Sequence, residues 1–159
     1  MNQDKIRIYL SASISNATNN QYICDKFSLD KFVIDLPQTI TPKELNHENF
    51  PLDVYQQCLV MMNASDIGLL LLDSYGRDCA WEAGWYSANK DKKLVAFVES
   101  SSHFMRDWMI KGGIDIFMTT NPRLYDYAIV DPVLRHKKVV FIEKLDDIGN
   151  KIFDLIKNK

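Results

Sequence analysis

Short runs of β-branched and leucine-rich residues alternate along the chain with longer segments whose apolar residues recur every three or four positions. Runs of the first kind are typical of buried strands, and segments of the second kind are typical of amphipathic helices. We expect strands at residues 6–11, 32–36, 67–73, 94–99 and 138–143, with a further candidate at 114–120. We expect helices near residues 18–28, 52–64, 78–90, 102–111 and 145–158.

This alternation predicts an α/β domain with a parallel sheet of five to six strands and helices on both faces. The segment 67–73, "IGLLLLD", is apolar on both faces and should therefore be a central strand. The segment 121–136 contains two prolines, at 122 and 132, which indicate a short helix or a loop between them. No internal repeat or linker is visible, so we expect a single domain over residues 1–159.

The composition argues against several classes of partner. With 47% hydrophobic and 25% charged residues, the chain resembles an ordinary globular domain. Its formal net charge of -2 gives no electrostatic reason to expect DNA or RNA as the main partner, because nucleic-acid binders carry basic patches. A small ligand of modest charge fits better.

The cysteines and the N-terminal segment indicate a cellular compartment. Three cysteines without C-x-x-C spacing suggest neither a disulfide framework nor a zinc site, and the histidines show no metal-ligand spacing. The chain starts without a basic, apolar leader, and no apolar run approaches about 18 residues. We therefore expect a cytoplasmic protein with no membrane span, no metal and no organic cofactor.

Three loops follow strands of the predicted sheet at their carboxyl ends, where ligands bind in open α/β sheets. They are "SASISN" at 11–16, "DSYGRDCAWE" at 73–82 and "SSSHFMRDW" at 100–108. The first loop offers the hydroxyls of Ser11, Ser13 and Ser15. These hydroxyls suit a sugar or a phosphate, and they suit an ordinary cap and turn equally well. The absence of a G-x-G-x-x-G or a triphosphate-binding loop disfavours hydride transfer and ATP hydrolysis.

The second loop leads into a predicted helix with Asp78 and Glu82 one turn apart. The helix dipole favours negative charge in a first turn, so both carboxylates can stay ionised there. One interpretation is structural, with Asp78 as the helix cap and Glu82 complementing the dipole. The other makes an ionised carboxylate next to a central strand a nucleophile toward an electrophilic carbon. Trp81 and Trp85, also one turn apart, indicate core or subunit-interface packing more than a stacking wall.

Taken together and in this order, the motifs resemble the nucleoside 2-deoxyribosyltransferase family, including the related nucleotide N-glycoside hydrolases. The similar segments, from residue 5 to about 113, are "IYLSASIS", "NASDIGLLLLD", "GRDCAWEAGWYSA", "KKLVAFVES" and "RDWMIKGG". The resemblance implies a flavodoxin-like (Rossmann-like) domain. It also implies that Glu82 attacks the anomeric carbon of a nucleoside or nucleotide, and that Asp78 lies near the departing base.

The resemblance assigns binding roles to further residues. It implies that Ser11, Ser13 and Ser15 contact the sugar or a 5'-phosphate. The loop residues Asp73 and Gly76 would also line the substrate site. Asp107 would reach the site of a neighbouring subunit, which implies a homodimer or a higher homo-oligomer.

Two alternatives keep the same fold. One is a TIR-like hydrolase that cleaves NAD through the same glutamate, and the other is a non-catalytic sensor that binds a nucleotide or nucleotide sugar. Two features favour the sensor. Cys58 stands where many members of the family carry an acidic residue, and the Asp78–Glu82 spacing is two residues shorter than theirs.

Overall fold

The computed structural model describes residues 5–40, 47–73, 75–100 and 104–157. Its centre is one parallel sheet with the strand order β2-β1-β3-β4-β5-β6. The strands are β1 (Ile6–Ser11), β2 (Phe32–Asp35), β3 (Ile67–Leu71), β4 (Lys93–Phe97), β5 (Ile116–Thr119) and β6 (Lys138–Phe141). This order is the flavodoxin-like one with a sixth strand added at the edge, so the predicted fold class is confirmed.

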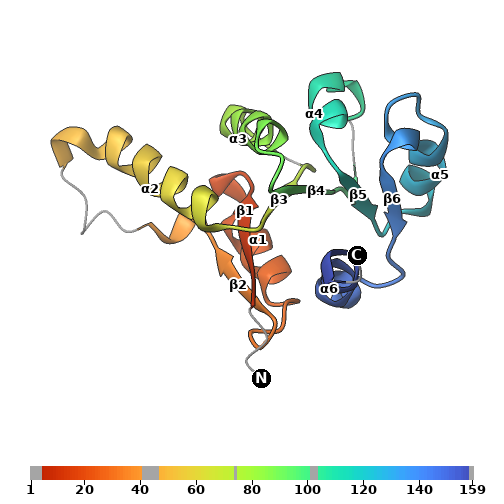
Figure 1. The fold of residues 1–159 in the computed structure, drawn as a ribbon, viewed down its shortest axis with the longest axis horizontal. Coiled ribbons are helices and arrows are strands. Elements are labelled where there is room, and N and C mark those ends of the chain that lie inside the picture. Colours follow the sequence, from red (N-terminus) through yellow and green to blue (C-terminus); the bar gives the residue numbers. More distant parts are fainter. Residues whose placement is uncertain (1–4, 41–46, 74, 101–103, 158–159) are drawn as a thin grey trace.

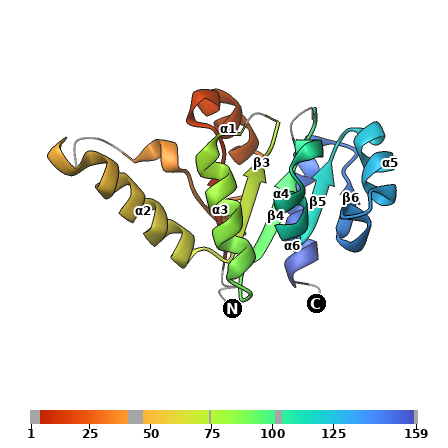
Figure 2. The same ribbon diagram turned by 90° about the horizontal axis from the view of Figure 1, so that it is seen from above.

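Helices cover both faces of the sheet (Figures 1 and 2). One layer holds α1 (Ala17–Cys24) and α6 (Ile148–Lys157). The opposite layer holds α2 (Phe50–Ala64), α3 (Arg77–Ala88), α4 (Trp108–Gly113) and α5 (Pro122–Val130). Short 3-10 turns connect these elements, at Ile14–Asn16, Pro37–Thr39, His47–Asn49, Phe104–Arg106, Leu134–His136 and Leu145–Asp147.

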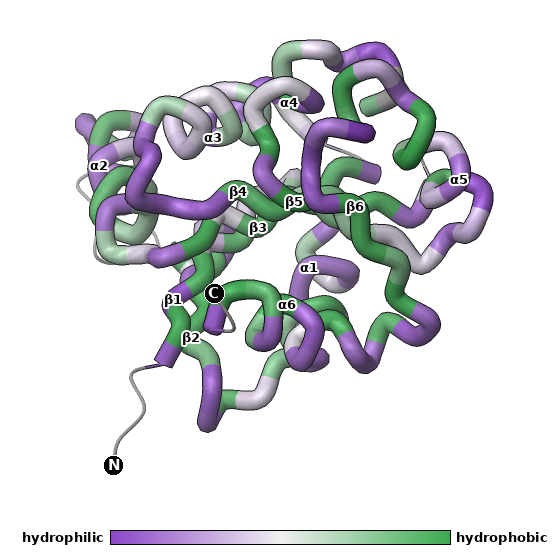
Figure 3. Tube along the Cα trace, turned by 45° about the vertical axis from the view of Figure 1, so that its right-hand side comes forward, coloured by the Kyte–Doolittle hydropathy of each residue, from purple (hydrophilic) through white to green (hydrophobic). Residues whose placement is uncertain are grey.

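Alternating strand side chains divide the core into two apolar clusters, because successive residues of a strand point to opposite faces. Ile8 and Leu10 of β1 join the cluster under α1 and α6, whereas Tyr9 between them joins the cluster under α2 to α5. All five residues of β3 are buried, which confirms its predicted central place. Figure 3 shows the hydrophobic residues following the strands at the centre of the molecule, with hydrophilic residues along much of the periphery.

The region after residue 113 is where the structure adds most to the expected elements. The candidate strand at 114–120 is β5, the segment between the two prolines is α5, and a 3-10 turn at Leu134–His136 follows the second proline. The helix expected at 102–111 is a 3-10 turn at Phe104–Arg106 and then α4, which begins at Trp108; residues 102 and 103 lie outside the described residues. Phe104 is fully buried and fixes the turn to the core, so the chain bends before the helix begins.

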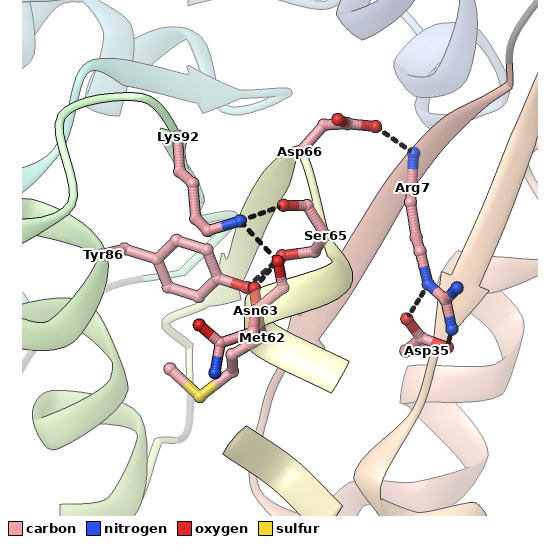
Figure 4. Close-up of polar contacts among 8 residues, drawn as sticks. All are labelled: Arg7, Asp35, Met62, Asn63, Ser65, Asp66, Tyr86 and Lys92. Atoms are coloured by element: carbon pink, nitrogen blue, oxygen red, sulfur yellow. Dashed lines mark hydrogen bonds and ion pairs between the residues drawn. The ribbon is translucent and has the colours of Figure 1, made fainter. Parts of the chain in front are cut away.

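The C-terminal end of α2 is tied to the sheet and to α3 by a group of polar contacts (Figure 4). Lys92 donates to the backbone carbonyls of Asn63 and Ser65, and the Ser65 hydroxyl lies 2.6 Å from the Tyr86 hydroxyl. Nearby, the Asp66 carboxylate accepts from the backbone N–H of Arg7 at 2.7 Å. The other end of α2 extends away from the sheet (Figures 1 and 2). Met62 is accordingly the one fully buried residue of this helix.

Candidate active site

The centre of the candidate site is Glu82, on the face of α3 that meets β1. Its side chain is buried, with 9% of the residue exposed. The Tyr9 hydroxyl donates to one carboxylate oxygen, and the Ser11 hydroxyl donates to the other at 2.5 Å. Tyr9 and Ser11 are two residues apart on β1, so both point to the same face of the sheet. The strand therefore presents a matched pair of donors to one carboxylate.

The local sequence explains how α3 can carry a carboxylate so close to the sheet. Gly68 of β3 lies directly under the Tyr86 ring, and a Cβ atom at residue 68 would come within 2.7 Å of ring carbons. The missing side chain lets Tyr86 settle against the strand with 2% of its surface exposed. Glu82 is one turn before Tyr86 on the same buried face, so the same close approach brings its carboxylate to β1.

Opposing influences set the charge state of Glu82. Burial raises the pKa of its carboxyl group above the ordinary value, and the hydrogen bonds from Ser11 and Tyr9 act in the lowering direction. The negative charge of Asp78 adds to the rise. Burial, together with the adjacent Glu82 charge, also raises the pKa of Tyr9, so its phenol stays protonated and keeps donating. The arrangement holds a carboxylate that is desolvated yet still stabilised by two donors.

Two thiols complete the surroundings of Glu82. Cys58 of α2 interacts with the Tyr9 hydroxyl, and Cys79 of α3 interacts with the Ser11 hydroxyl. Burial raises the pKa of both thiols, so both are neutral at physiological pH. Neither thiol therefore places a second negative charge beside Glu82, and neither is an activated nucleophile.

The structure separates the roles that the sequence left open for Asp78. The N-cap of α3 is Gly76, and the helix begins at Arg77, so the interpretation of Asp78 as the cap is wrong. Asp78 is an exposed residue of the first turn, where the helix dipole stabilises its charge. It lies one turn before Glu82 and acts on it electrostatically. The predicted pair is therefore close together, with one carboxylate buried and the other in contact with solvent.

The serines of the first loop lie in two different environments. Ser11 is fully buried, and its hydroxyl contacts Glu82 rather than solvent. Ser13 and Ser15 lie in the loop beyond β1, and their hydroxyl oxygens are 2.7 Å apart. The buried side chain of Asn20 braces this loop by donating to the Ser13 carbonyl at 3.0 Å.

The remaining predicted site residues lie apart from the Glu82 carboxylate. The Asp73 carboxylate accepts from the backbone N–H groups of Glu99 and Ser100, so it joins the carboxyl ends of β3 and β4. Gly76 is exposed at the start of α3. Asp107 occupies the N-cap position of α4 and lines a groove between α3 and α4. One chain therefore brings Ser11, Asp78 and Glu82 together but leaves Asp107 elsewhere.

Tyr9 is the residue of this site that the sequence interpretation missed. The sequence does contain an indication of its role. A tyrosine in a buried strand needs a partner for its hydroxyl, and Tyr9 lies two residues before Ser11, on the same face of the strand. The partner itself comes from α3, 73 residues further along the chain, and only the folded structure brings the two together.

The described part of the chain shows two further absences. It contains no cluster of three or more His, Cys, Asp or Glu side chains arranged to hold a metal ion. None of its helices is long and apolar enough to cross a membrane.

Comparison with known proteins identifies the fold. No family model and no curated protein matches the sequence. Among solved structures, the chain is similar to 2-deoxyribosyltransferase from the psychrotolerant bacterium Bacillus psychrosaccharolyticus, described as a biocatalyst for the synthesis of nucleosides. The TM-score is 0.54 at 19% identity, and the match covers 70% of this chain and 84% of that one. At this level of identity the likeness shows a shared fold.

Proposed function

We propose that this protein cleaves or exchanges the N-glycosidic bond of a nucleoside or nucleotide, with Glu82 as the nucleophile. The observation that carries the proposal is the buried Glu82 carboxylate, held through both oxygens by Tyr9 and Ser11. Its place next to the carboxyl end of β1, where ligands bind in such sheets, supports the proposal. The fold that the chain shares with a 2-deoxyribosyltransferase also supports the proposal, and from it we infer a distant relationship between the two proteins.

The proposed reaction has two steps. In the first, one Glu82 oxygen attacks the anomeric carbon of the sugar while the bond to the base breaks, and the bonding electron pair leaves with the base. Each carboxylate oxygen has a second lone pair, so it can attack while still accepting a hydrogen bond. In the second step, water or another base attacks the same carbon and loses a proton to Asp78. The bond between that carbon and Glu82 breaks, and its electron pair returns to the carboxylate. A nearby carboxylate stabilises the oxocarbenium-like transition states of both steps.

The other residues have supporting roles in this scheme. Ser11 and Tyr9 position the Glu82 carboxylate and keep it ionised. Asp78, one turn away and exposed, lies on the side where the base departs and relays a proton to it. Ser13 and Ser15 bind the sugar or a 5'-phosphate from the loop beyond β1.

The proposal extends to the assembly and the compartment. We propose a homo-oligomer, because the resemblance places Asp107 in the site of a neighbouring subunit, and Asp107 is not among the groups that act on Glu82 in its own chain. The reduced state of Cys24, Cys58 and Cys79 is consistent with the cytoplasm as the compartment.

The experiment follows base release and base exchange by chromatography. Purified protein is incubated with nucleosides, deoxynucleosides, their 5'-monophosphates and NAD, with and without a free acceptor base. Exchange without hydrolysis indicates a transferase, release without exchange indicates a hydrolase, and nicotinamide release indicates the NAD-cleaving alternative. Binding without turnover after long incubation supports the sensor alternative, and it would fit the neutral Cys58 thiol beside Tyr9.

The variant Glu82→Gln tests the nucleophile directly. We expect base release to fall at least about a thousandfold, because a neutral amide cannot form the glycosyl intermediate. Intact-protein mass spectrometry of the wild type should show a glycosyl adduct that the variant lacks. The matched control is Glu143→Gln, the same change at an exposed position beyond β6. Full activity in Glu82→Gln would disprove the mechanism.

Loss of folding is not the expected cause of that inactivity. Because the pKa of Glu82 is raised on folding, its charge destabilises the folded state above that pKa. The amide removes the buried charge, so Glu82→Gln should melt at or above the wild-type temperature at neutral pH. A melting curve of the same preparation provides this check.

A further inference from the structure

Tyr86 connects the Glu82 site to the end of a neighbouring helix. It lies one turn after Glu82 on the buried face of α3. Its hydroxyl is 2.6 Å from the hydroxyl of Ser65, the residue that ends α2. Ser65 donates its single proton to the Met62 carbonyl at 2.8 Å, so Tyr86 is the donor in its contact with Ser65. The direction of the Tyr86 hydroxyl is therefore fixed.

Lys92 holds the Ser65 side of this contact in place (Figure 4). Its ammonium group donates to the backbone carbonyls of Ser65 at 2.5 Å and Asn63 at 2.9 Å. A cation is stabilised at the C-terminal end of a helix, where carbonyls lack intrahelical partners and the helix dipole is negative. Ser65 is 2% exposed, so the bond from Tyr86 is shielded from water. The end of α2 is thus a firm anchor for the Tyr86 hydroxyl.

The Tyr86 ring contacts the residue that holds Glu82. The centroids of the Tyr86 and Tyr9 rings are 6.3 Å apart with an interplanar angle of 38°, within the range of favourable aromatic pairs. Gly68 of β3 also lies against the Tyr86 ring, and both tyrosines are buried. Buried side chains are closely packed, so a tilt of the Tyr86 ring would displace the Tyr9 ring. The Tyr9 hydroxyl, which donates to Glu82, would move with it.

We propose that Tyr86 is a positioning residue for the Glu82 nucleophile and that it acts through Tyr9. The bond from Tyr86 to Ser65 fixes the tilt of the Tyr86 ring, and this ring fixes the direction in which the Tyr9 hydroxyl donates. Among the hydrogen bonds of the described residues, none joins Tyr86 to Glu82 directly. The inference rests on the proposed function for the role of Glu82 as nucleophile, whereas the contacts that hold the carboxylate do not depend on the reaction.

The variant Tyr86→Phe keeps the ring and removes the bond to Ser65. Donation from Tyr9 should weaken, so the pKa of Glu82 should rise and the acid limb of the pH–rate profile of base release should move to higher pH. We expect kcat to fall about threefold to tenfold with KM unchanged, because the carboxylate is misplaced while the groups that bind the substrate are intact. A loss of stability alone would not move the acid limb of the folded protein.

The other titratable groups that face Glu82 are unchanged in this variant. They are Tyr9 of β1, Cys58 of α2, and Asp78 and Cys79 of α3. Burial raises the pKa of Tyr86 itself, so its phenol is neutral at physiological pH and its removal changes no charge. A shift in the pKa of Glu82 therefore reports a change in its hydrogen bonds.

Two double variants separate a positioning role from a purely structural one. Ser65→Ala removes the same bond from the other partner, so its combination with Tyr86→Phe should shift the pKa of Glu82 no more than the larger single shift. Tyr86→Phe added to Tyr9→Phe should give no further shift, because the hydroxyl through which Tyr86 acts is already missing. Tyr125→Phe, at a half-buried tyrosine of α5, is the matched control and should leave the pKa unchanged.

The pKa of Glu82 is measured without substrate by NMR titration of the side-chain carboxyl carbons, and its resonance is the one that Glu82→Gln lacks. An unchanged pKa in Tyr86→Phe would overturn the proposal. A further rise when Tyr86→Phe is added to Tyr9→Phe would also overturn it. If the wild type releases no base, the proposed reaction fails, and the NMR titration still decides the role of Tyr86.

Discussion

The pKa of Glu82 depends on opposing contributions that single substitutions can separate. Burial raises it, while the hydroxyls of Ser11 and Tyr9 stabilise the charged form and lower it. Tyr9→Phe removes one donor and keeps the ring, so the pKa of Glu82 should rise further. Since the ionised form is the nucleophile, the acid limb of the pH–rate profile of base release should move to higher pH. The plateau rate should fall by up to about a hundredfold from misplacement of the carboxylate.

The matched control is Tyr125→Phe, a half-buried tyrosine of α5 that should leave the profile unchanged. If Tyr9→Phe lowers the plateau without moving the acid limb, Tyr9 has only a packing role, and the proposed electrostatic role is disproved.

The sequence could indicate Glu82 from its place after a central strand. It could not indicate that both donors lie on β1, because that depends on how closely α3 approaches the strand.

At the scale of elements, the contact between β3 and α3 rests on one missing side chain. In Gly68→Ala the new Cβ atom would meet Tyr86 ring carbons at 2.7 Å. Tyr86 is buried and its hydroxyl is paired with Ser65, so the ring has little room to move. We expect a loss of about 1–3 kcal/mol in the free energy of unfolding, measured with urea. Gly112→Ala, at an open helical position, should be neutral or stabilising. A neutral Gly68→Ala would show that α3 is not pressed against the strand.

A buried ion pair joins α4 to the end of α5. Lys111 donates to Asp131 at 2.6 Å, and both side chains are 3% exposed. Burial alone would raise the pKa of Asp131, but Lys111, Tyr127 and two backbone N–H groups together hold it below its usual value. Asp131→Asn leaves the Lys111 charge buried without a partner, so we expect a loss of about 3–5 kcal/mol in unfolding free energy. Asp126→Asn, on the exposed side of α5, is the matched control.

The pH dependence of this loss provides a second check. A carboxyl group whose pKa falls on folding stabilises the protein above its unfolded pKa, and that stabilisation declines as the pH falls. The difference in unfolding free energy between the wild type and Asp131→Asn should therefore be largest near neutral pH and should shrink below about pH 4. A difference that does not change with pH would contradict the assigned charge state. No motif in the sequence indicated this ion pair, because Lys111 and Asp131 lie 20 positions apart on different elements, and only the fold brings them together.

At the scale of the whole molecule, the hydrophobic pattern was sufficient for the sheet and its two helical layers. A strand that is buried between two layers of helices is apolar on both faces, so its run of apolar residues predicts the layered architecture directly. The shape of the molecular surface leaves no comparable pattern in the sequence. Small side chains on a helix can serve a close approach to the sheet or a recess in the surface, and those of α3 at Ala80, Gly84 and Ser87 line a groove open to solvent. Exposed Trp108 could not be distinguished from a core residue until its exposure was known.

The proposed homo-oligomer makes thermal stability depend on protein concentration. If folded chains associate, mass action stabilises the folded state as the concentration rises. Over a hundredfold range of concentration, the melting temperature should rise by about 3–5 °C. Differential scanning calorimetry at a series of matched concentrations measures this rise. A melting temperature that is independent of concentration would contradict the proposed association.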